Sequence, residues 1–172
     1  MTAGILQPGT AMVVRFGALA AMLGGALRII SSFVPYQVDQ PWLEALYGLI
    51  DLCLLFGLIG VYLAFAEALG AIGFVLFVVA TAGLASIVGP DAQMFGVDFY
   101  RAGALVFIVA LAAFSVQLLR KKTVIASATM WILALAFSLA SPFAQLAFMG
   151  AGILLGAGYV LAGLAILRLS RR

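Results

Sequence analysis

The stretch LYGLIDLCLLFGLIGVYLAF, residues 46–65, decides the fold class of this chain. Nearly all of its residues are apolar, and its length is that of a helix crossing the hydrocarbon core of a bilayer. Asp51 lies near its middle. Because an acid at that depth is costly and is usually paired or functional, the stretch predicts a membrane helix that carries one candidate functional group.

The composition of the whole chain supports the same class. Hydrophobic residues make up 66% of the 172 residues and charged residues 9%, with a mean hydropathy of +1.27. A soluble domain has about 25% charged residues. The net charge is +3, and its basic residues cluster at segment ends. Such clusters report membrane orientation, so we expect a cell-membrane protein with no nucleic-acid partner.

Six apolar segments are predicted to be transmembrane helices. The expected fold is therefore an all-α, polytopic six-transmembrane-helix bundle forming a single domain over residues 1–172. The last two segments are separated only by a short break at Ser141 and Pro142, so a re-entrant hairpin is the alternative there. The segments are residues 11–34, 43–65, 71–88, 101–119, 124–140 and 144–167.

Basic clusters predict the orientation. They occupy residues 120–122 and 168–172, which a six-helix topology places on one side of the membrane. The loops expected on the other side, residues 35–42 and 89–100, contain aspartates and no lysine or arginine. Because short loops rich in lysine and arginine stay in the cytoplasm, both termini are predicted to be cytoplasmic.

Short matches between the two halves suggest an internal repeat. RFGAL at residues 15–19 returns as RAGAL at residues 101–105, 86 residues later. Halves 1–88 and 89–172 would each hold three helices, and an odd number inverts the second half. Inverted repeats are a recurrent transporter architecture. The alternative is that a chain so rich in alanine, glycine and leucine produces such matches by chance.

Four residues form the candidate intramembrane polar site. Asp51 lies roughly 12 Å inside its helix and Arg28 roughly 9 Å inside the preceding one, at 1.5 Å per residue. An unpaired charge at mid-bilayer costs about 2.5–3.5 kcal/mol, so we expect an Arg28–Asp51 pair facing the bundle interior. Tyr47 and Tyr62 share the helical face of Asp51. The site is interpreted as a polar pocket or an ion path; the alternative is a static salt bridge that fixes helix register.

Several chemistries are excluded by residue types that the chain lacks. It has no histidine, which removes histidine-ligated metals and histidine-assisted nucleophiles. Cys53 is its one cysteine, so no disulfide can form within the chain. The glycine-rich run at residues 150–158 lies in an apolar segment, which favours helix packing over phosphate binding. We therefore expect no metal, no cofactor and no enzymatic activity.

Small residues indicate close helix packing, within the chain or against a partner. They recur at Gly17, Ala21 and Gly25 and at Gly152 and Gly156. The expected partners are membrane lipids, a second copy of the chain or other membrane subunits. These features predict a carrier of a small solute or ion, or its membrane-embedded binding subunit. The alternative is a non-catalytic structural or assembly subunit of a larger membrane complex.

Overall fold

The computed structural model describes residues 8–34, 40–88, 93–94, 97–141 and 144–170. Within these residues the chain is almost entirely helical, with one two-stranded antiparallel hairpin between the second and third helices. Asp98 starts the third helix by accepting a hydrogen bond from the Arg101 backbone N–H at 2.8 Å. The elements are α1 (Pro8–Ser31), α2 (Pro41–Ala85), β1 (Gln93–Met94), β2 (Val97–Asp98), α3 (Phe99–Arg120), α4 (Ile125–Ala140) and α5 (Gln145–Leu169).

The prediction of a bundle of six transmembrane helices is wrong. The described residues form five helices, and four of these, α1, α2, α3 and α5, are long and apolar enough to cross a membrane. Residues 66–69 are strong helix formers, so the second predicted helix extends to Leu69, and Gly70 alone separates it from the third within the single element α2. With 16 residues, α4 rises about 24 Å, short of the roughly 30 Å of a hydrocarbon core.

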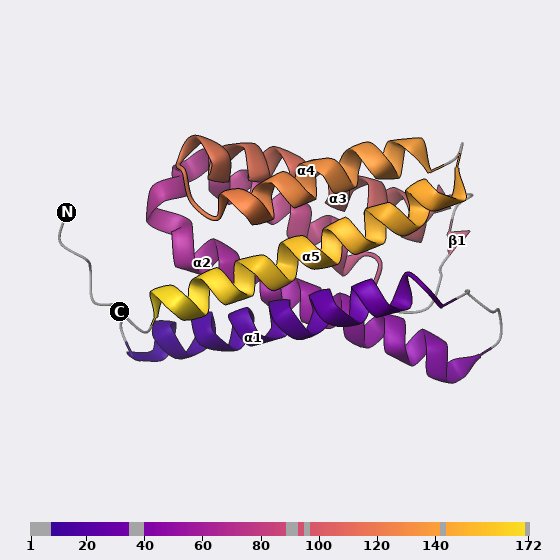
Figure 1. Ribbon diagram of the computed structural model, residues 1–172, viewed down its shortest axis with the longest axis horizontal. Coiled ribbons are helices and arrows are strands. Elements are labelled where there is room, and N and C mark those ends of the chain that lie inside the picture. Colours follow the sequence, from indigo (N-terminus) through magenta and orange to yellow (C-terminus); the bar gives the residue numbers. More distant parts are fainter. Residues whose placement is uncertain (1–7, 35–39, 89–92, 95–96, 142–143, 171–172) are drawn as a thin grey trace.

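A sharp bend at Gly70 divides α2 into two arms, residues 41–69 and 71–85. Gly70 has φ 61° and ψ −160°, a backbone conformation open essentially to glycine alone. The rings of Tyr62 and Phe77 stack with centroids 4.3 Å apart, although 15 residues of straight helix would separate them by about 22 Å. The second arm therefore folds back along the first (Figure 1).

The predicted inverted repeat is also wrong. Residues 1–88 supply α1 and the two arms of α2, of which the last arm is the short one, whereas residues 89–172 supply three helices, of which the middle one, α4, is short. The two halves thus differ in the order of their long and short helices. The matches at residues 15–19 and 101–105 are therefore accounted for by the narrow amino-acid composition of the chain.

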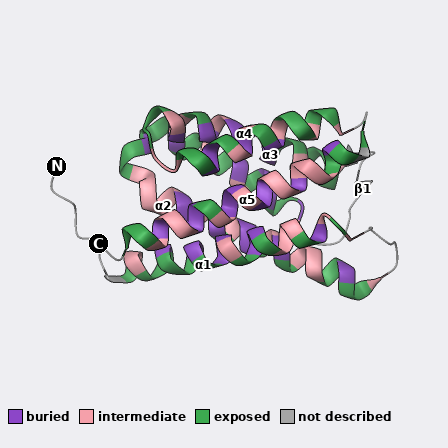
Figure 2. Ribbon diagram, in the orientation of Figure 1, coloured by how far each residue is buried: buried purple, intermediate pink, exposed green. Residues whose placement is uncertain are grey.

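The helices pack side by side into one bundle (Figure 1). α1 packs against α2 and α5, α2 also packs against α3, and α4 joins α3 to α5. The largest side chains that are fully buried include Trp131, Tyr159 and Phe114. Large apolar side chains also cover the outside, among them Phe16, Ile72 and Leu146, each more than half exposed (Figure 2). Such an apolar surface belongs in lipid, and it identifies a membrane protein.

Small residues let α1 approach two neighbours closely. A Cβ atom on Gly60 of α2 would lie 2.7 Å from the Gly17 Cα atom of α1. A Cβ atom on Gly156 of α5 would meet the carbonyl oxygen of Gly25. The predicted small-residue packing therefore joins helices of the same chain. The prediction of a partner subunit must rest on other surfaces.

Candidate intramembrane polar site

Three of the four predicted site residues lie where α1 faces the first arm of α2. Arg28 is in the last turn of α1, and Asp51 is roughly 15 Å from the start of α2. Tyr47 is one helical turn before Asp51 and shares its face. All three side chains are partly buried. The antiparallel contact of α1 with α2 thus places an acid and a base within the bundle.

Arg28 and Asp51 are coupled electrostatically. Burial of the Asp51 carboxylate is the larger effect on its charge, and the positive charge of Arg28 opposes that effect in part. Coulombic attraction between separated charges is appreciable in a medium of low dielectric constant. The base on the neighbouring helix therefore compensates the buried acid only partly. A direct ion pair between them stays a prediction.

Gly152 of α5 makes room for the Ser32 hydroxyl beside Arg28. A Cβ atom at this position would lie 3.7 Å from Arg28 Nε and would collide with the Ser32 hydroxyl. The hydroxyl groups of Ser31 and Ser32 donate hydrogen bonds to the Arg28 carbonyl oxygen at 3.0 and 2.9 Å. These bonds add to the one that the Arg28 carbonyl oxygen accepts from the Ser32 backbone N–H at 3.2 Å, at the end of α1. The site thus has a third wall, formed by α5.

Tyr159 of α5 joins the site, and the sequence analysis missed it. Its side chain is entirely buried, and burial affects its hydroxyl more than the charge of Asp51 does. That hydroxyl has no hydrogen-bond partner among the described residues. The Tyr159 ring packs edge-on against Trp131, 5.1 Å between centroids, and Trp131 Nε1 donates to the Leu155 carbonyl at 3.3 Å. The sequence signal that could have identified Tyr159 was a tyrosine in the middle of an apolar segment, directly after the glycine-rich run at residues 150–158.

Tyr62 lies away from the other residues of the candidate site. It lies 11 residues beyond Asp51 on the same arm of α2, a rise of roughly 16 Å. Its ring stacks on Phe77 and approaches Phe74 with centroids 5.9 Å apart. Tyr62 therefore contributes to the contact between the two arms of α2.

The site contains no cluster typical of a metal centre. In the part of the chain that the structure describes, no three histidine, cysteine, aspartate or glutamate side chains come together. Cys53 is a buried free thiol, and its Cβ atom fills the space over Gly24 of α1. The candidate site therefore offers one carboxylate, one guanidinium and the phenols of Tyr47 and Tyr159.

Comparisons of the chain with protein-family models, with curated proteins and with solved structures gave no match. The fold and the surface define the class, an all-helical membrane protein. Its distinguishing feature is the candidate polar site, in which Arg28, Tyr47, Asp51 and Tyr159 lie where α1, α2 and α5 meet.

Proposed function

We propose that the protein is a carrier of a small polar solute or ion, or the membrane-embedded binding subunit of such a carrier, with Asp51 at its binding site. The observation that carries this proposal is the Tyr159 hydroxyl, which is entirely buried, acted on by Asp51, and without a hydrogen-bond partner among the described residues. Burying an unsatisfied hydroxyl costs about 1–3 kcal/mol. A bound ligand or hydrated ion would satisfy it.

The chemistry of the site suits a small polar ligand. Asp51 supplies a hydrogen-bond acceptor with negative charge, Arg28 a donor with positive charge, and Tyr159 a donor or acceptor. Ionisable groups inside a membrane commonly mark solute, ion or proton pathways. A static salt bridge would need Arg28 and Asp51 alone, whereas a binding site also gives a role to the Tyr159 hydroxyl.

The orientation proposed for the chain places its basic end in the cytoplasm. Arg15 Nη2 donates to the Ser170 carbonyl oxygen at 3.3 Å, so the first turns of α1 lie beside the end of α5. Lys122 and Arg168 line one hollow at this same end. Arg171, Arg172 and parts of the predicted outer loops lie outside the described residues. The positive-inside tendency then favours cytoplasmic termini.

Native mass spectrometry of the affinity-purified protein in mild detergent tests the proposal. We expect the chain alone or self-associated, carrying a small molecule or ion of constant mass. Asp51→Asn should lose this adduct. Glu44→Gln, which neutralises an exposed acid in the first turn of the same helix, is the matched control and should keep it. Stoichiometric membrane proteins in place of a small adduct would contradict the carrier and favour the structural-subunit alternative.

A further inference from the structure

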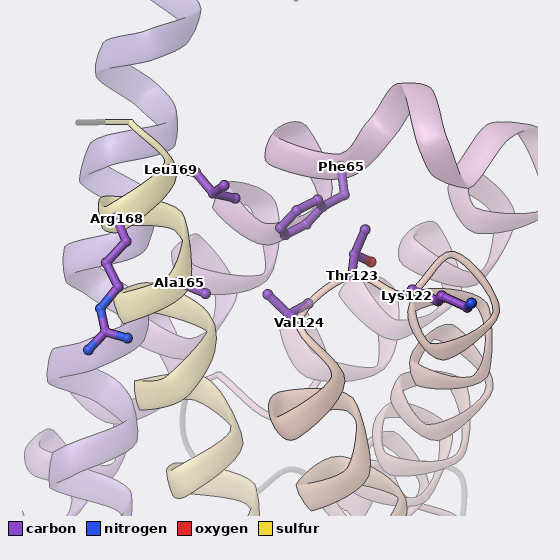
Figure 3. Close-up of a pocket in the computed structure, with 7 residues that line it drawn as sticks. All are labelled: Phe65, Lys122, Thr123, Val124, Ala165, Arg168 and Leu169. Carbon is purple, nitrogen blue, oxygen red and sulfur yellow. The ribbon is translucent and has the colours of Figure 1, made fainter. Parts of the chain in front are cut away.

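A groove at the basic end of the bundle has no part in the polar site. It encloses about 470 Å³ between the first arm of α2, the α3–α4 connection and the end of α5 (Figure 3). Phe65, Val124, Ala165 and Leu169 give it an apolar lining. Lys122 and Arg168 lie on opposite sides of that lining in Figure 3. The groove thus combines a hydrocarbon-like surface with two cations at its rim.

The groove continues along the seam between α4 and α5. A second hollow of about 240 Å³ shares Val124, Ala165 and Arg168 with the first and adds Leu161 and Leu164 of α5. From Arg168 to Leu161, α5 rises about 10 Å toward the middle of the bundle. An apolar track therefore leads from the charged rim into the depth at which lipid tails lie.

The backbone of the α3–α4 connection fixes the rim. The Thr123 N–H donates to the Leu118 carbonyl at 3.0 Å and the Lys122 N–H to the Leu119 carbonyl at 2.9 Å, which is the Schellman pattern at the end of α3. Lys122 (φ 55°) and Val124 (φ 36°) both adopt the left-handed conformation. These bonds hold Lys122 and Val124, the residues on either side of Thr123, in one defined turn.

We propose that this groove binds an anionic phospholipid, with its head group across the rim between Lys122 and Arg168 and an acyl chain along the α4–α5 seam. A free phosphate ion would make no use of the apolar track. A lipid without net charge would make no use of the two cations. An anionic lipid uses both, and basic pockets between membrane helices bind such head groups.

Thermal unfolding of delipidated protein in detergent, titrated with phosphatidylglycerol, tests this assignment. We expect the unfolding midpoint to rise with lipid. The double variant Lys122→Ala/Arg168→Ala should bind with an apparent affinity about 30-fold weaker, since each basic residue contributes modestly at an anionic surface. Both side chains are exposed, so the variant should fold. Arg120→Ala/Lys121→Ala removes two charges beside the groove and should bind like the wild type.

Four results would overturn the proposal. Inorganic phosphate raising the midpoint as far as the lipid does would indicate an ion site, and phosphatidylcholine binding equally would show that charge plays no part. Equal weakening in Arg120→Ala/Lys121→Ala would indicate diffuse surface attraction. Ala165→Phe fills the track and retains both cations, so its binding should also weaken. Unchanged binding by Ala165→Phe would show that the acyl chain lies elsewhere.

Discussion

At the scale of single residues, the Tyr159 hydroxyl separates a binding site from a structural one. Tyr159→Phe removes this group and keeps the ring on Trp131. Because the hydroxyl has no partner among the described residues, we expect the free energy of unfolding to stay unchanged or to rise by about 1 kcal/mol. Thermal unfolding measures this, and native mass spectrometry should show a weaker small-molecule adduct. A loss of stability with an unchanged adduct would contradict a binding role.

The Arg28–Asp51 coupling is also tested at this scale. Asp51→Asn should destabilise the protein because Arg28 then loses its compensating charge. Adding Arg28→Gln should recover about 1–2 kcal/mol, a typical interaction energy for neighbouring groups. Unfolding free energies of the two single variants and the double variant measure the coupling. Additive single effects would show that the two charges do not interact. If the adduct also returns in the double variant, the pair is purely structural.

The depth of Asp51 and Arg28 in their segments led to the prediction that these two residues pair across α1 and α2, which stays a prediction. Tyr159 could not be found in the same way. Its approach to Asp51 depends on how α5 packs against α1 and α2. The spacing of residues along α5 does not predict that packing. Tyr62 was selected by helical periodicity, which assigns a face but ignores its distance along the helix.

At the scale of the elements, the α1–α2 contact depends on paired glycines. Gly60→Ala should destabilise by about 1–3 kcal/mol, because its Cβ atom would lie 2.7 Å from Gly17 Cα and α1 would have to shift. Gly48→Ala is the control, since a Cβ atom there meets nothing within 4 Å and alanine favours the helix by about 0.5–1 kcal/mol. Thermal unfolding of both variants should give opposite signs. Equal effects would contradict the close contact.

The end of α3 offers a second matched pair. Lys122 has φ 55°, so Lys122→Gly should stabilise lipid-free protein by about 0.5–1 kcal/mol. Lys121 has φ −87°, and Lys121→Gly, which removes the same charge from the same turn, should destabilise by a similar amount. Chemical denaturation in detergent measures both. Stabilisation by both variants would indicate relief of charge repulsion in place of backbone strain.

Sequence patterns predicted α3 and α5 to within about two residues, because long apolar runs are bounded there by Asp98, basic residues and Pro142. They failed between residues 65 and 71. Ala66, Glu67 and Ala68 favour a helix, and only Gly70 departs from it. A short turn was expected between the segments 43–65 and 71–88, whereas the chain stays helical through Leu69 and turns at Gly70 alone. The short α4 was assigned a full span from hydropathy alone.

At the scale of the whole molecule, composition was sufficient for the class: few charges and an apolar surface identify a membrane protein. The sequence does not tell which helices the small residues bring together, because the same spacing serves contacts within a chain and contacts between chains. In the structure these positions join α1 to α2 and α5. The polar site therefore lies where three closely packed helices of one chain meet.

A carrier with Asp51 at its binding site requires the face of α2 around Asp51 to open to water, and cysteine labelling in native membranes measures that opening. In a Cys53→Ser background, Leu55→Cys places a thiol one turn beyond Asp51 on the same face, and Leu49→Cys places one on the exposed, lipid-facing side at lesser depth. A small, water-soluble methanethiosulfonate reagent should label the cysteine at position 55 faster than the one at 49. Equal protection of both positions would show a dry interior and contradict the proposed carrier.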